Sequence, residues 1–282
     1  MTADRLWVGT SWKMNKTLAE AAAFVDALVA ADLPPGIQPF VLPAHTALAH
    51  VRDRLPAGSP VLLGAQNAHW GPEGAATGEI SMRMAADAGA VLVEMGHSER
   101  RAGFGETDLT VGLKAAAALR QGLLPLVCVG EPREVRDAGG ATDFIAAQVR
   151  AALSRVRPDE VGRVLVAYEP VWAVGEHGRP ATQDQIAPVM AMIAEVVAEA
   201  AGGSSARALL YGGGVHADNA EELLTDPHTD GLFVGRAGWD VAGYRQLLDL
   251  SAPFAAKRPS VRRASSSDER FSGNVAISPS RR

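Results

Sequence analysis

The chain has 282 residues, of which 47% are apolar and 21% charged, a composition that is typical of a globular protein with a large aliphatic core and excludes disorder as the main state. The net charge of −5 is uneven, because residues 257–282 contain seven Lys or Arg against Asp268 and Glu269 and so carry +5, which leaves −10 on residues 1–256. An acidic body of that sign repels a phosphate backbone, so we expect it not to bind nucleic acid.

Eight short apolar runs recur along the body, and segments with helical spacing separate them. Each run is four to seven residues long and continuously apolar, which is typical of a strand buried on both faces. The runs cover residues 6–12, 37–42, 61–65, 90–95, 124–129, 164–168, 208–211 and 231–234. Ala, Leu and Val at three- and four-residue spacing predict amphipathic helices at 18–30, 109–121, 144–156 and 185–201, with Asp108 and Thr182 as N-caps.

A strand followed by a helix, repeated eight times over about 250 residues, predicts parallel strands with right-handed crossovers. This count favours a closed (β/α)8 barrel over the alternative, a doubly wound sheet, and no G-x-G-x-x-G string follows the first run. We therefore expect one α/β domain, a TIM barrel, over residues 1–256. Residues 257–282 are basic, rich in Ser and without periodicity, so we expect a disordered tail there.

The compartment and the absence of a metal are expectations from general features. Residues 1–5 lack an export pattern, and no stretch approaches the roughly 18 apolar residues that cross a bilayer. We expect a cytoplasmic protein without a membrane partner. The single cysteine, Cys128, lies in an apolar run and is interpreted as a packing residue, not a nucleophile. No His, Asp or Glu cluster has ligand spacing, so we expect no metal.

Three of the expected strands are followed at once by an ionisable side chain. Lys13 follows the first, His97 the fourth and Glu169 the sixth. Each alone is more often a solvated lysine, a structural histidine or a strand-ending glutamate. Because a barrel of this kind builds its active site at the carboxyl ends of its strands, the three are expected to meet. Together they provide a carboxylate base, a proton donor and a fixed cation for an oxyanion.

The last two expected strands end in glycine-rich turns. Tyr211 is followed by three glycines at 212–214, and the eighth strand is followed by Gly235 and Arg236. Glycine lets the backbone approach a ligand closely. In a barrel these two loops are the usual phosphate site, so we expect an anion there.

Seven strings occur in a characteristic order and spacing: W-K-M-N (12–15), A-Q-N (65–67), T-G-E-I-S (77–81), G-H-S-E-R-R (96–101), C-V-G-E (128–131), A-Y-E-P-V-W-A-V-G (167–175) and Y-G-G-G-V (211–215). Over residues 5–250 the chain thereby resembles the triosephosphate isomerase family. The resemblance implies a cofactor-free proton transfer between adjacent carbons of a small phosphorylated sugar. It also implies a homodimer, in which the loop at residues 66–81, with Thr77 near its tip, inserts into the partner.

The resemblance assigns a role to each ionisable residue. Glu169 matches the base that removes a proton next to the carbonyl and returns it to the neighbouring carbon. His97 matches the electrophile that shuttles protons between the two oxygens of the enediolate. Lys13 matches the cation that holds the substrate and stabilises negative charge. Glu99 matches a supporting carboxylate, for which a structural ion pair is an equal alternative.

The resemblance also implies the residues that bind and enclose the substrate. Residues 170–181 match the mobile lid of the family, which includes Trp172, and Tyr211 matches the residue that latches it. Closure of such a lid excludes water and suppresses elimination of phosphate from the enediolate. The substrate-binding residues implied are Ser11, Gly175, Gly213, Gly214, Gly235 and Arg236.

Four departures from the family pattern bear on the substrate. Ser11 stands where Asn is usual, Gly214 where Ser is usual and Arg236 where a second Gly is usual, while the lid segment 175–181 is one residue longer and contains Pro180. The shorter Ser11 leaves room beside the reacting carbons. These features resemble the erythrulose-phosphate (tetrulose-phosphate) isomerase branch, which acts on a four-carbon substrate.

Two substrates therefore stay open. We place first the interconversion of dihydroxyacetone phosphate and D-glyceraldehyde 3-phosphate, because the family as a whole mostly performs it. The alternative is the interconversion of L-erythrulose 1-phosphate and D-erythrulose 4-phosphate at the same site.

Two interpretations from other classes are disfavoured. An inactive scaffold predicts the loss of at least one of Lys13, His97 and Glu169, and all three are present. A Schiff-base aldolase needs a lysine inside a central strand in an apolar setting, whereas Lys13 follows its strand.

Overall fold

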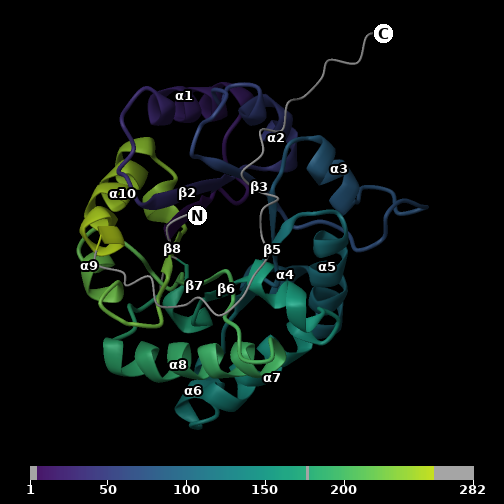
Figure 1. Cartoon of the computed structure of the whole chain (residues 1–282), viewed down its shortest axis with the longest axis vertical. Helices are drawn as coiled ribbons and strands as arrows, with labels where there is room; N and C mark the ends of the chain where they lie inside the picture. Colours follow the sequence, from purple (N-terminus) through teal and green to yellow (C-terminus); the bar gives the residue numbers. More distant parts are fainter. Residues whose placement is uncertain (1–4, 176–177, 257–282) are drawn as a thin grey trace.

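The computed structural model describes residues 5–175 and 178–256, in which eight parallel strands close into a barrel (Figure 1). Each strand pairs with its neighbours in the chain, and β8 pairs with β1. The strands are β1 (Leu6–Ser11), β2 (Ile37–Leu42), β3 (Leu62–Gln66), β4 (Leu92–Met95), β5 (Leu124–Val129), β6 (Leu165–Tyr168), β7 (Ala208–Tyr211) and β8 (Gly231–Val234). The predicted TIM barrel is thus confirmed, whereas the predicted tail at 257–282 lies outside the described residues.

Helices surround the barrel (Figure 1). The α-helices are α1 (Leu18–Val29), α2 (His45–Arg52), α3 (Met82–Asp87), α4 (Ser98–Phe104), α5 (Asp108–Arg120), α6 (Arg133–Asp137), α7 (Ala141–Leu153), α8 (Gln183–Ala200), α9 (Ala220–Leu223) and α10 (Val241–Ala256). Three short 3-10 helices are η1 (Pro158–Arg163), η2 (Val171–Ala173) and η3 (Arg236–Gly238).

The two predicted N-caps have different outcomes. Thr182 precedes α8 as expected, and its backbone N–H donates to Gln185 Oε1 at 3.0 Å. The prediction for Asp108 was wrong, because Thr107 is the N-cap of α5 and Asp108 is its first residue. The Thr107 hydroxyl accepts a hydrogen bond from the backbone N–H of Thr110, which satisfies one of the free donors at the start of the helix.

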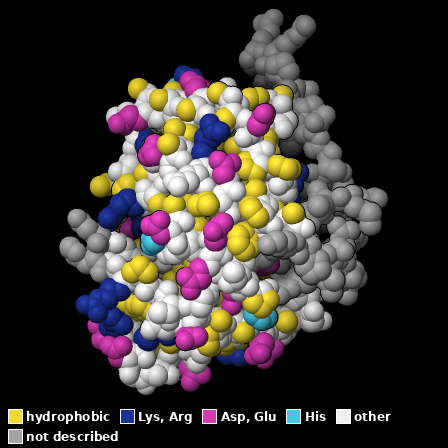
Figure 2. All heavy atoms as spheres, turned by 90° about the vertical axis from the view of Figure 1, so that its left-hand side faces the viewer, with side chains coloured by type: hydrophobic (Ala, Val, Ile, Leu, Met, Phe, Trp, Pro, Cys, Tyr) yellow, Lys and Arg dark blue, Asp and Glu magenta, His cyan; other side chains and the backbone are white. Residues whose placement is uncertain are grey.

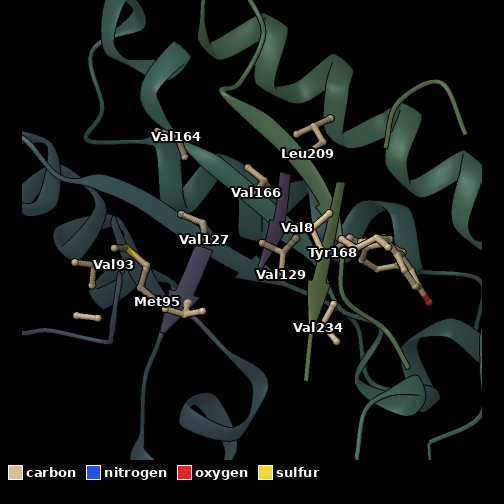
Figure 3. Close-up of a cluster of buried hydrophobic side chains, with 14 of the residues drawn as sticks. Val8, Val93, Met95, Val127, Val129, Val164, Val166, Tyr168, Leu209 and Val234 are labelled. Atoms are coloured by element: carbon tan, nitrogen blue, oxygen red, sulfur yellow. The ribbon is translucent and has the colours of Figure 1, made fainter. Parts of the chain in front are cut away.

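Alternate strand residues build two separate apolar layers, which explains why the strands are apolar on both faces. Inward-pointing side chains such as Phe40, Leu126 and Phe233 fill the barrel. Outward-pointing side chains such as Val127 and Val166 pack in the layer between strands and helices (Figure 3). Because apolar side chains occupy both the inner and the outer face of the strands, a polar site has room only at an end of the barrel.

The outer surface is mixed in character. On the face around α9 and α10, acidic side chains are spread among apolar ones and basic side chains lie in separate groups (Figure 2). In the part of the chain that the structure describes, no helix is both long and apolar enough to cross a membrane.

Candidate active site

The three predicted catalytic side chains meet at the carboxyl ends of the strands. Lys13 lies just after β1, His97 just after β4 and Glu169 directly after β6. His97 Nε2 lies 3.6 Å from Glu169 Oε2, and Lys13 Nζ lies 2.6 Å from Glu99 Oε1. The second Glu99 oxygen is 3.7 Å from His97 Nδ1, so the four residues form one connected group.

Lys13 is positioned by an unusual backbone turn. Its φ of 52° lies in the left-handed region, which side chains other than glycine rarely adopt. The Asn15 side-chain amide donates to Trp12 O at 2.8 Å and closes the same turn. With 20% of its side chain exposed, Lys13 remains accessible to a ligand while it pairs with Glu99.

His97 is held as a neutral imidazole. It is the N-cap of α4, and its Nδ1 accepts a hydrogen bond from the backbone N–H of Glu99 at 3.1 Å. Burial and the positive charge of Lys13 lower the pKa of His97 to about 4. Since Nδ1 is an acceptor, the proton resides on Nε2, the atom nearest Glu169. His97 is therefore able to donate a hydrogen bond to a substrate oxygen.

Glu169 is a buried carboxyl with a basicity suited to proton transfer. Burial, and next the negative charge of Glu94, raise its pKa to about 8. Its Oε2 has no hydrogen-bond partner among the described residues. Cys128 itself is buried, and its raised pKa disfavours the thiolate, in agreement with its interpretation as a non-nucleophile.

Gly212 leaves room for the Glu169 side chain. A Cβ at this glycine would lie 2.9 Å from Glu169 Cγ and 3.0 Å from Oε1. The glycine-rich turn after β7 therefore packs against the Glu169 carboxyl. This contact adds to the predicted role of the turn, in which its backbone approaches a ligand.

Ser11 has a partner that the sequence analysis missed. Its Oγ donates to Glu94 Oε2 at 2.9 Å, and both residues are buried. The expectation that residues 90–95 are continuously apolar was wrong, because Glu94 lies within β4. A single acidic residue inside an otherwise apolar strand was the signal in the sequence that pointed to it.

The base of the predicted lid is anchored by a second missed residue, Glu131. Trp172 Nε1 donates to Glu131 Oε1 at 2.8 Å, and Arg136 Nε donates to the same oxygen at 2.6 Å. Glu131 is fully buried and also accepts from the Tyr168 hydroxyl at 3.3 Å. It occurs in the C-V-G-E string, but only the fold brings it to Trp172.

The segment beyond Trp172 is described except for residues 176–177. Gly175 has a φ of +91°, a conformation that suits glycine and turns the chain at that point. The Arg179 backbone N–H donates to Trp172 O at 3.2 Å, so the described end of the segment folds back on its beginning.

Tyr211 and the glycines after it line the other side of this region. A Cβ at Gly213 would lie 2.5 Å from the Tyr211 hydroxyl, and one at Gly214 would lie 3.0 Å from Ala173 O. The buried Tyr211 hydroxyl has no hydrogen-bond partner in residues 5–175 and 178–256. Its assignment as a latch stays a prediction.

The two predicted anion-binding turns are neighbours, because β7 pairs with β8. Gly235 directly follows β8 and has open space where a Cβ would stand, and η3 begins at Arg236. Neither Gly235 nor Arg236 contacts the catalytic group directly in any described interaction. Across the same described residues, no cluster of three His, Cys, Asp or Glu is arranged to hold a metal.

Comparisons with known proteins agree on the class of this chain. A family model described as triosephosphate isomerase matches residues 6–251. A protein named L-erythrulose-1-phosphate isomerase from Mycolicibacterium smegmatis is 51% identical over 253 residues, which cover 89% of this chain and 94% of that protein. A Brucella abortus protein of the same name is 50% identical, covering 90% and 98%, and one from Rhizobium meliloti is 51% identical, covering 89% and 99%.

Proposed function

The chain belongs to the triosephosphate isomerase family and is an isomerase, and from this premise we propose that it interconverts L-erythrulose 1-phosphate and D-erythrulose 4-phosphate. The choice of substrate is supported by the identity of about half of the aligned residues, over about nine-tenths of this chain, with proteins named L-erythrulose-1-phosphate isomerase. The triose phosphates, expected first from the sequence, are therefore the less favoured substrate pair.

The catalytic group suits a proton transfer between C3 and C2 of such a substrate. Glu169 removes the C3 proton while the C2 carbonyl oxygen receives a proton from His97 Nε2, which gives a 2,3-enediol. His97 Nε2 then takes the proton of the C3 hydroxyl while Glu169 returns its proton to C2, so that C3 becomes the carbonyl and both side chains regain their starting states. Lys13 stabilises the negative charge that develops on oxygen. No cofactor is needed, because no net electron transfer occurs.

The phosphate is assigned to the turns after β7 and β8. Glycine at 213, 214 and 235 lets backbone N–H groups come close to an anion there, and Arg236 adds a positive charge. Residues 170–181 then cover the enediolate and exclude water, which suppresses loss of phosphate. Trp172, tied to Glu131, fixes one end of this segment.

A homodimer completes the proposal. The loop between β3 and α3 extends from the barrel beside α3 (Figure 1), and residues 72–79 within it are all exposed. Two large apolar side chains are strongly exposed. Met14, next to Lys13, is 97% exposed, and Phe104, at the end of the helix that follows His97, is 71% exposed. A partner that received this loop would cover apolar surface of this kind.

Steady-state assays on both substrates test the proposal. We expect kcat/KM for L-erythrulose 1-phosphate to exceed that for dihydroxyacetone phosphate. A value for the triose phosphate more than about a hundredfold above the tetrulose value, a gap of about 2.7 kcal/mol in transition-state binding, would contradict it.

A further inference from the structure

Glu94 is a buried carboxyl to which the proton transfer assigns no task. It is 5% exposed, and among residues 5–175 and 178–256 its one hydrogen bond comes from Ser11 Oγ. Two other buried carboxyls of the described chain, Glu106 and Glu131, are much better satisfied. Glu106 pairs with Lys114 at 3.0 Å and Arg100 at 2.8 Å, and Glu131 accepts from three donors. Glu94 has no cationic partner in that part of the chain.

This arrangement is unfavourable for folding alone. Burying a carboxyl without compensating hydrogen bonds costs free energy, so such groups are usually fully paired or serve a function. A carboxyl has room for several hydrogen bonds, and Ser11 uses one of them. The remaining capacity suits a polar group that arrives from outside.

The position of Glu94 connects it with the catalytic group. Its neighbours Val93 and Met95 belong to the outer layer and Leu92 to the inner layer, so by strand alternation Glu94 points into the barrel. It lies three residues before His97. The negative charge of Glu94 raises the pKa of Glu169. The pKa of Glu94 is itself raised by burial, and the positive charge of Lys13 opposes that rise, so the three groups interact.

The barrel order fixes which end of a substrate Glu94 can meet. In the closed order from β1 to β8, β4 lies opposite β8. A substrate whose phosphate occupies the turns after β7 and β8 therefore extends its other end toward the β4 side. In L-erythrulose 1-phosphate that other end is a hydroxymethyl group on C3, which dihydroxyacetone phosphate lacks.

We propose that Glu94, oriented by Ser11, binds the terminal hydroxyl of the four-carbon substrate and so determines the substrate class. The inference rests on the proposed tetrulose-phosphate function. Burial raises the pKa of Glu94 to about 7, so both protonation states occur near neutral pH. A hydroxyl group pairs with either one, because it donates to a carboxylate and accepts from a carboxylic acid. Ser11 is then a positioning residue that acts through Glu94.

The experiment compares three substrates with the wild type and two variants. The substrates are L-erythrulose 1-phosphate, its 4-deoxy analogue and dihydroxyacetone phosphate. Glu94→Leu removes the hydrogen-bonding group at similar size, and Glu94→Gln keeps it. We expect Glu94→Leu to lower kcat/KM for erythrulose phosphate at least tenfold more than for dihydroxyacetone phosphate, and Glu94→Gln to have a much smaller effect on that ratio.

The 4-deoxy analogue gives an independent readout. The wild type should discriminate against it at least tenfold, and in Glu94→Leu this discrimination should vanish. Equal losses on all substrates, or wild-type discrimination below about threefold, would overturn the role of Glu94. If Glu94→Leu fails to fold, the role of Glu94 is tested by the discrimination in kcat/KM against the 4-deoxy analogue, measured in the wild type and in Glu94→Gln. A wild type without activity on erythrulose phosphate would instead contradict the proposed function itself, and the inference with it.

Discussion

Nε2 of His97 lies 3.6 Å from Oε2 of Glu169, and neither atom has a hydrogen-bond partner among the described residues. The distance is too long for a direct hydrogen bond. An N–H donor and a basic carboxylate are thus held side by side and left available. A hydroxyketone is in position to react when its carbonyl oxygen lies at His97 Nε2 and the adjacent carbon lies at Glu169 Oε2.

Shortening the base tests the role of Glu169. Glu169→Asp keeps the charge but withdraws the carboxylate by about one carbon, and a misplacement of that size costs about a hundredfold or more in rate. We expect kcat to fall by about that factor, measured on erythrulose phosphate. Glu199→Asp, in the last turn of α8 on an exposed position, is the matched control and should keep its rate. Unchanged turnover in Glu169→Asp would remove Glu169 from the role of base.

The pH dependence should reflect the raised pKa of Glu169. Only the deprotonated carboxylate accepts a proton, so kcat/KM should rise with pH through the free-enzyme pKa of about 8. Glu94→Gln removes a negative charge that raises this pKa, so its acid limb should shift to lower pH. A profile with the same midpoint in both proteins would show that the two carboxyls do not interact.

Gly212 should be needed for activity more than for folding. In Gly212→Ala the new methyl group would lie 2.9 Å from Glu169 Cγ and 3.2 Å from the Phe233 carbonyl oxygen, and we expect the glutamate side chain to move away from it. We expect kcat to drop about tenfold to a hundredfold, with little change in Tm. Gly162→Ala serves as control, because its Cβ would meet only Ser205 O at 3.8 Å. Full activity in Gly212→Ala would contradict the packing argument.

The oligomeric state should depend on the exposed loop after β3. Light scattering coupled to size exclusion should give twice the chain mass of 29.5 kDa for the wild type. Thr77→Arg places a long charged side chain at the loop tip, and we expect it to shift the protein toward the monomer. Thr142→Arg makes the same exchange at an exposed position on α7 and should stay dimeric. A monomeric wild type, or equal masses for both variants, would rule out this interface.

Patterns along the chain were sufficient to predict the barrel and to place the three candidate catalytic residues at the ends of its strands. Continuous apolar runs separated by helical periods identify buried parallel strands, and Lys13, His97 and Glu169 each stand directly after one of them. Local patterns of this kind need only short-range information. These patterns could not identify the N-cap of α5, because Thr107 and Asp108 are adjacent and both residue types are good N-caps.

Which distant residues meet depends on the closed barrel and could not be predicted from patterns along the chain. In the sequence Glu94 is a single acidic residue in an apolar strand, and only the closed barrel brings its Oε2 within 2.9 Å of Ser11 Oγ on β1. Glu131 likewise becomes the anchor of Trp172 only once β5 and β6 pair. Pairing across a barrel depends on strand order and on which way each side chain points, and a spacing pattern along the chain contains neither.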